Sequence, residues 1–202
     1  MANVLIIGAT SLMGQVATRY FLDKTDDNIT LMARYTGLLS INEKRERVFQ
    51  GDIIDEKVLD AAMKGNDVVL VSLDSNQERL IQKIVDAMDK EHVDRLLFLT
   101  SMGVCNEVPL TPGASGDLTD QSLLEPYQEV IAVVENSDLN YTIIRPSWLD
   151  NGKDADNYEV VHNGQPFHVD QVSRESVADF IVQLAHSQKL ASRDDVAISR
   201  RA

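Results

Sequence analysis

Short apolar runs alternate with helical patterns along most of the chain, and this alternation limits its possible folds more than any other feature. The runs occupy residues 3–7, 29–33, 47–50, 67–71, 95–99 and 141–145, and most are apolar at consecutive positions. Strands buried on both faces of a parallel sheet have this pattern. Between them, residues such as Ile81, Ile84 and Met88 form apolar helical faces. We therefore predict an α/β fold, a doubly wound parallel sheet of the Rossmann type.

The pattern changes after residue 145. Two short runs surround Asn163-Gly164 within residues 158–169, which predicts a hairpin with a type I′ turn. Residues 173–187 then predict a helix with Ser173 as its N-cap. The stretch 101–120 is rich in proline and glycine and predicts a loop over the crevice at the carboxyl ends of the strands. We expect residues 1–202 to form one domain, with the hairpin and helix as a small C-terminal part.

Composition excludes several classes of function. The chain is 44% apolar and 25% charged, as in globular proteins, and has neither a run of roughly 20 apolar residues nor a signal peptide pattern, so we expect it in the cytoplasm. Its net charge of -13 disfavours nucleic acid and membrane surfaces as partners. Cys105 is the only cysteine, and His162 and His168 lack a third ligand, so we predict no metal site.

The segment GATSLMG, residues 8–14, follows the first predicted strand and opens a helix. A turn of this kind places a helix N-terminus against a dinucleotide pyrophosphate. Gly8 permits the tight turn and Gly14 permits close packing of helix on strand, while Ser11 replaces the usual middle glycine with a small hydroxyl side chain. The alternative is a tight turn that binds no ligand.

The residues after the second predicted strand bear on the choice of cofactor. No acidic residue stands there to bind an NAD ribose, and Arg34 lies nearby, which suits the 2′-phosphate of NADP. We therefore expect NADP(H) to be preferred over NAD(H). The alternative is that Arg34 is an ordinary solvated surface arginine.

Taken together, these motifs resemble the atypical short-chain dehydrogenase/reductases, a group of NAD(P)H-binding proteins that includes NmrA-like regulators and biliverdin-IXβ and flavin reductases. The resemblance covers most of the chain. It rests on the order and spacing of GATSLMG, the Arg34 position, GDIID at 51–55, DVVLVSL at 67–73, LLFLTSMG at 96–103, YTIIRPSWLDNG at 141–152 and VSRESVADFI at 172–181.

The resemblance implies a set of cofactor contacts. Asp52 would accept a hydrogen bond from the adenine amino group with Ile53 beside the ring, although Asp52 also suits a helix N-cap or a turn. The remaining implied contacts are phosphate donors at Thr10, Ser11, Leu12 and Met13, cofactor-lining Ser72 and Leu73, and Ser101, Pro146 and Trp148 near the nicotinamide.

The catalytic positions depart from the usual family pattern. Short-chain dehydrogenases pair a serine with a tyrosine and a lysine four residues later, because tyrosine needs a nearby cation to exchange a proton at neutral pH. Ser101 and Tyr127 occupy the serine and tyrosine places, but Ile131 stands where the lysine would be. Tyr127 also fits a simpler interpretation as a core or crevice-wall residue, and Ser101 as a strand-end serine that bonds backbone.

Hydride transfer to a flavin or quinone needs no such proton relay, because the acceptor ring delocalises the charge and can take its proton from water. The sequence therefore favours an NADPH-dependent reductase of a flavin, quinone or similar planar acceptor. The alternative is a non-catalytic, NADP(H)-sensing regulator of the NmrA-like kind. Nucleotide-sugar epimerases are disfavoured, because they need the tyrosine-lysine pair and a larger substrate domain.

Overall fold

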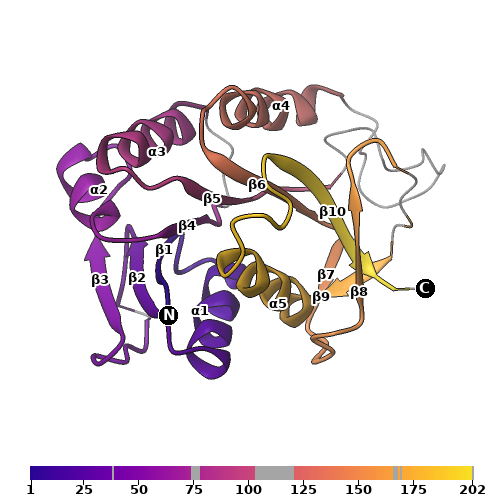
Figure 1. Ribbon diagram of the computed structural model, residues 1–202, viewed down its shortest axis with the longest axis horizontal. Coiled ribbons are helices and arrows are strands. Elements are labelled where there is room, and N and C mark those ends of the chain that lie inside the picture. The colour runs from indigo at the N-terminus through magenta and orange to yellow at the C-terminus, as the bar shows by residue number, and fades with distance from the viewer. Residues whose placement is uncertain (38, 74–77, 103–120, 166–167, 169, 202) are drawn as a thin grey trace.

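The computed structural model describes residues 1–202 apart from 38, 74–77, 103–120, 166–167, 169 and 202; for residues 121–126 it describes the backbone only. An eight-stranded sheet, ordered β3-β2-β1-β4-β5-β6-β10-β8, forms its centre (Figure 1). Its strands are β1 (Asn3–Ile7), β2 (Asn28–Ala33), β3 (Glu46–Gln50), β4 (Val68–Val71), β5 (Arg95–Leu99), β6 (Asn140–Pro146), β8 (Tyr158–His162) and β10 (Asp194–Arg200). The predicted doubly wound Rossmann sheet is confirmed.

The six predicted apolar runs form β1 to β6, each within one residue of its predicted bounds. Every residue of β4 is buried, as are four of the five in β1. These strands can be apolar at consecutive positions because helices cover both faces of the sheet. The pairings among β1 to β6 are all parallel, so the carboxyl ends of these strands meet at one edge.

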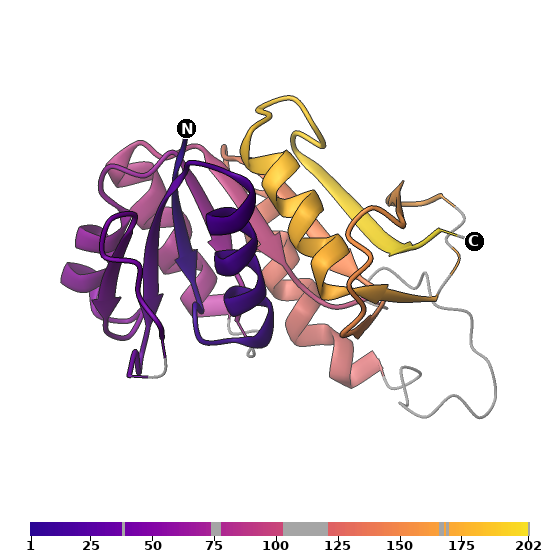
Figure 2. The ribbon, with the colours of Figure 1, turned by 90° about the horizontal axis from the view of Figure 1, so that it is seen from below.

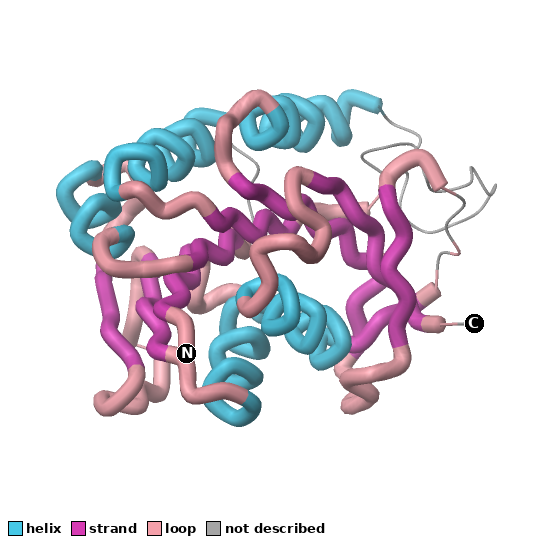
Figure 3. The backbone as a smooth tube through the Cα atoms, viewed as in Figure 1, coloured by secondary structure: helices cyan, strands magenta, loops and turns pink. Residues whose placement is uncertain are grey.

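In the described part of the chain, helices cover both faces of this sheet (Figures 2 and 3). One face carries α2 (Glu56–Met63), α3 (Glu78–Glu91) and α4 (Gln121–Glu135), whereas the other carries α1 (Leu12–Lys24) and α5 (Arg174–Ala185). Separate apolar clusters fill the two layers, around Ile84 and Val130 on the first face and around Phe21 and Ile181 on the second. In the second layer α1 and α5 lie side by side, joined by the hydrogen bond from Tyr20 to Asp179.

The C-terminal helix is confirmed as α5 with Ser173 as its N-cap, but the strands of this part differ from the prediction. The strand β8 pairs antiparallel with β10, which the sequence did not indicate, and residues 166, 167 and 169 of the proposed second hairpin arm lie outside the described residues. The type I′ turn is wrong, because that turn needs a positive φ at both central residues. Gly164 has a φ of 80°, but Asn163 is not among the described residues with a positive φ.

A second, two-stranded parallel sheet was also not predicted. It pairs β7 (Trp148–Asp150) with β9 (Gln171–Ser173), which directly precedes α5. This small sheet holds the start of α5 close to the carboxyl edge of β6. The predicted loop over residues 101–120 falls almost entirely outside the described part of the chain, as does Cys105.

None of the helices in the described residues combines the length and the apolarity that crossing a membrane would require.

Candidate functional site

The turn between β1 and α1 fits tightly against the end of β4. Gly8 has a φ of 86°, and a Cβ atom added there would lie 2.0 Å from the carbonyl oxygen of Ser72. A Cβ on Gly14 would lie 2.4 Å from the carbonyl oxygen of Gly8. Both glycines are therefore required by close backbone approach, and the first also by its left-handed conformation. The structure thus confirms the tight turn predicted at Gly8 and the close packing predicted at Gly14.

The middle position of this turn does not need glycine. Ser11 has a φ of -64° and is the N-cap of α1, and its Oγ accepts the N–H of Gly14 at 2.9 Å. The same Oγ lies 2.8 Å from the Oγ of Ser72. Serine is unstrained at this position, and the next two residues, Leu12 and Met13, belong to the first turn, whose N–H groups have no partner within the helix.

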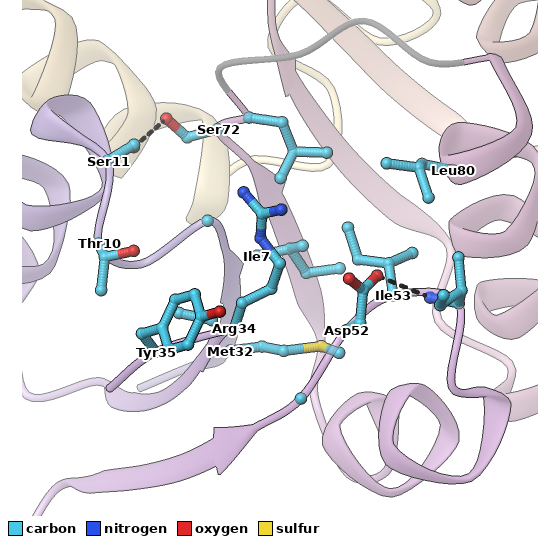
Figure 4. Close-up of a pocket in the computed structure, with 15 residues that line it drawn as sticks. Ile7, Thr10, Ser11, Met32, Arg34, Tyr35, Asp52, Ile53, Ser72 and Leu80 are labelled. Atoms are coloured by element: carbon cyan, nitrogen blue, oxygen red, sulfur yellow. Dashed lines mark hydrogen bonds between the residues drawn. The ribbon is translucent and has the colours of Figure 1, made fainter. Parts of the chain in front are cut away.

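A cavity of about 360 Å³, here called the Arg34 cavity, opens at the carboxyl edge between β1, β2 and β4 (Figure 4). It brings together eight residues that the sequence assigned to a cofactor: Gly8, Thr10, Ser11, Arg34, Asp52, Ile53, Ser72 and Leu73. Residues that the sequence analysis missed complete its wall: Ile7, Met32, Ala33, Tyr35, Gly51, Ile54 and Leu80.

Arg34 and Asp52 approach this cavity from neighbouring strand ends. The guanidinium of Arg34 extends from the end of β2 toward the side of the cavity formed by Ser72 (Figure 4). Among the described residues no carboxylate forms an ion pair with Arg34. Asp52 is a turn carboxylate whose Oδ1 accepts the N–H of Ile54 at 3.2 Å, and the N-cap of α2 is Asp55 instead. Both side chains thus offer polar groups to a ligand.

A second cavity of about 430 Å³, here called the Arg174 cavity, lies further along the same edge toward β5 and α5. Four residues, Thr10, Ser11, Ser72 and Leu73, line both cavities, so the two adjoin at the Ser11–Ser72 contact. The other lining residues are Leu12, Met13, Leu99, Thr100, Ser101, Tyr127, Leu149 and Arg174. The candidate catalytic residues Ser101 and Tyr127 therefore share this cavity.

The usual proton relay would need a lysine on α4, four residues after Tyr127. Tyr127 is partly buried, packs against the apolar cluster of that layer and lines the Arg174 cavity. Ile131 is 7% exposed and belongs to the cluster itself. A lysine at this position would bury its charge in the core, which is costly without a partner.

Two predicted residues lie elsewhere. Pro146 ends β6 and Trp148 begins β7, with 49% of its surface exposed, and neither lines either cavity. His162, which the sequence analysis considered only as a possible metal ligand, lies on β8 with its Nδ1 2.6 Å from Asp194 Oδ2. Sequence reasoning missed Thr100 and Arg174, although Thr100 directly precedes Ser101 and Arg174 directly follows the predicted cap Ser173.

The arrangement suits an extended dinucleotide. The glycine turn lets the connection from β1 to α1 approach the end of β4 closely. The first turn of α1 offers N–H groups for a pyrophosphate, and adjoining cavities lie on either side of this turn. These features define a dinucleotide-binding Rossmann protein. A model of the NAD(P)H-binding family matches residues 8–188, and the chain belongs to this family within the atypical short-chain dehydrogenase/reductases.

Solved structures agree with this assignment. A short-chain dehydrogenase/reductase from Veillonella parvula is 26% identical, with a TM-score of 0.89 over 99% of this chain and 95% of that one. A structure of such a protein from the same organism in complex with NADP is 25% identical, with a TM-score of 0.87 over 98% and 94%.

An anaerobillin reductase from Escherichia coli O157:H7 shares the fold, with a TM-score of 0.83 over 98% of this chain and 97% of that one at 20% identity. A search of curated proteins finds no match.

Proposed function

We propose that this protein is an NADPH-dependent reductase of a flavin, quinone or similar planar acceptor. The observation that carries the proposal is the adjoining pair of cavities, one beside Arg34 and one beside Ser101 and Tyr127, connected at Ser11 and Ser72. The first suits the 2′-phosphate end of the cofactor and the second suits the nicotinamide together with an acceptor. The NADP complex of the Veillonella protein and the reductase activity in the name of the Escherichia protein support this reading.

Separate residues bind the two ends of the cofactor and the acceptor. Arg34, which is permanently charged, binds the 2′-phosphate, and Asp52 accepts a hydrogen bond from the adenine amino group. The first turn of α1 binds the pyrophosphate. Leu12, Leu99 and Leu149 supply apolar wall beside the reacting rings, where exclusion of water favours face-to-face stacking. When bound, NADPH supplies a hydride.

The proton requirement distinguishes this reaction from alcohol oxidation. Because residue 131 is a buried isoleucine, Tyr127 lacks the lysine four residues later that the usual mechanism uses. A reduced flavin or quinone can take its proton from water, so Ser101 and Tyr127 orient the acceptor and need not complete a relay.

The test begins with titration of the purified protein with NADPH and with NADH, followed by NADPH oxidation with a panel of flavins, quinones and simple ketones. We expect tighter NADPH binding and turnover with flavins or quinones but not ketones. Tight NADPH binding with no turnover of any acceptor would overturn the reductase in favour of the sensing role. Failure to bind either nucleotide would contradict both.

A further inference from the structure

The Arg174 cavity contains a cation that the proposed hydride transfer does not use. Arg174 is the first residue of α5, directly after the β7–β9 sheet. Its Nη1 donates to the carbonyl oxygen of Asp150 at 2.9 Å and to Oδ1 of Asn151 at 2.8 Å. These two contacts fix the guanidinium at the cavity wall, and both are made by a single nitrogen.

The charge of Arg174 is not neutralised by a direct partner. Within the described part of the chain, Arg174 forms no ion pair with a carboxylate. The nearby carboxylate of Asp150 instead pairs with Arg200, with Oδ2 2.6 Å from Nη2, and accepts the Gly152 N–H at 2.6 Å. Asp150 has a lowered pKa, caused first by that N–H and then by Arg200, with a smaller contribution from Arg174.

Two residues that line this cavity each have a buried side-chain polar atom without a hydrogen-bond partner among the described residues. These atoms are Nε of Arg174 and Oγ1 of Thr100. Leaving a buried polar atom without a partner destabilises the fold, so such atoms are rare unless a bound group or water completes them. Arg174 and Thr100 thus bring a cationic side chain and a hydroxyl to the wall of the cavity, and neither has its full set of hydrogen bonds.

The position of Arg174 does not serve the stability of α5. The N-terminus of a helix carries partial positive charge, so the first turn favours anions and disfavours cations. Glu175 satisfies that preference and forms an ion pair with Arg19 on α1. Arg174 and the helix end therefore both contribute positive potential on this side of the cavity.

We infer that Arg174, with Thr100, binds an anionic group, a carboxylate or a phosphate, carried by the planar acceptor. The inference rests on the proposed function and narrows its substrate class. Leu12, Leu99 and Leu149 suit a flat apolar ring, whereas a guanidinium suits the oxygens of an acidic substituent on it. Arg174 is thus a specificity-determining residue, separate from the 2′-phosphate site at Arg34.

The test compares acceptors that share a ring and differ in charge, with protein saturated with NADP⁺. The pairs are FMN with riboflavin and anthraquinone carboxylate with anthraquinone carboxamide, and the first readout is the Kd of each. Wild-type protein should bind one or both anionic partners on the order of tenfold more tightly, the size of one charge-assisted hydrogen-bonded contact. The advantage should shrink at high salt.

Three variants test whether Arg174 causes the preference for anionic acceptors. Arg174→Gln should abolish the preference for the anion while leaving the Kd of the neutral partner and of NADPH within about twofold, since less than half a kcal/mol separates such values. Arg174→Lys should retain part of the preference. The control is Arg19→Gln, which also removes one positive charge. Arg19 forms an ion pair with Glu175, the residue after Arg174, so this variant should leave the preference unchanged.

The outcomes separate this inference from the proposed function. Turnover without a charge preference, or with a preference that survives Arg174→Gln, would overturn the inference and leave the reductase standing. An Arg174-dependent preference in binding without NADPH oxidation would support the anion site and contradict the reductase. Weaker NADPH binding by Arg174→Gln with an unchanged acceptor preference would assign Arg174 to the cofactor and overturn the inference. Failure to bind any of the four probes would overturn it as well.

Discussion

The hydroxyls of Ser11 and Ser72 lie 2.8 Å apart, where the N-cap of α1 meets the end of β4. Their contact stands between the Arg34 cavity and the Arg174 cavity, because both residues line both. The serine that replaces the usual middle glycine of the turn thus has two structural roles: it caps the helix and it links two strand ends. The substitution is compatible with a working dinucleotide turn.

The capping role predicts different effects for two replacements of Ser11. Ser11→Ala removes the acceptor for the Gly14 N–H and should lower the free energy of unfolding by about 1 kcal/mol. Ser11→Gly, which restores the commoner residue, should cost only a few tenths of a kcal/mol because glycine leaves the first-turn N–H groups open to water. Denaturant unfolding measures both. An alanine variant as stable as wild type would show that the hydroxyl does not stabilise α1.

Gly8 offers a sharper test of the turn, with Gly65 as a matched control. Both have positive φ, 86° and 76°, but a Cβ on Gly65 would meet nothing within 4 Å. Gly65→Ala should therefore cost about 1 kcal/mol of unfolding free energy from its conformation alone. Gly8→Ala should cost a further ~1–3 kcal/mol from the clash with Ser72 and should weaken NADPH binding. Similar effects of the two variants would contradict the close approach.

A buried carboxylate on the amino side of the sheet predicts acid sensitivity. Burial alone would raise the pKa of Asp27, but the Ala2 N–H at 2.7 Å and the imidazole of His186, with Nε2 2.9 Å from Oδ2, outweigh it and lower the pKa. Since the folded-state pKa lies below the unfolded one, this stabilisation is present above the ordinary carboxyl range and is lost as the pH falls through the folded-state pKa.

Asp27→Asn isolates that contribution. The variant should lose about 1–3 kcal/mol of unfolding free energy at neutral pH, and the gap from wild type should narrow as the pH falls below about 4. Asp26→Asn is the control, because Asp26 is exposed beside it. Urea unfolding across this range checks the prediction, and a constant gap at every pH would refute it.

The sheet and the turn could be predicted because their signals are local. Consecutive apolar residues specify β1 and β4, and the spacing of Gly8 and Gly14 reflects contacts within one βα unit. The strand β10 was missed because its apolar centre, Val196 to Ile198, is short and is flanked by the polar residues Asp195 and Ser199. It forms a strand because β6 and β8 lie on either side of it, which is a tertiary effect.

Both cavities were predicted in part. The family resemblance implied most of the cofactor residues that line them, and the parallel order of the strands explains why residues at separate strand ends meet at one edge. Leu149 and Arg174 were missed, because α5 and β7 bring them to the Arg174 cavity through the unpredicted β7–β9 pairing. For the same reason Trp148 and Pro146, although close in sequence to Leu149, do not line it.

The proposed preference for NADPH is tested most directly at Arg34. Arg34→Asp removes the cation proposed to bind the 2′-phosphate and introduces a carboxylate that can accept from a ribose hydroxyl. We expect NADPH binding to weaken by on the order of tenfold or more, the size of one lost charge-assisted contact, with NADH much less affected.

Lys44→Asp makes the same charge change on an exposed residue that lines neither cavity, so it shows how much of the loss is due to overall charge. Calorimetric titration of each variant with both nucleotides gives the Kd values. An equal loss for NADPH and NADH in Arg34→Asp would mean that Arg34 supports the turn or contacts a group common to both cofactors. A loss confined to NADPH would place the 2′-phosphate at the end of β2, with the Ser11 turn between it and the acceptor.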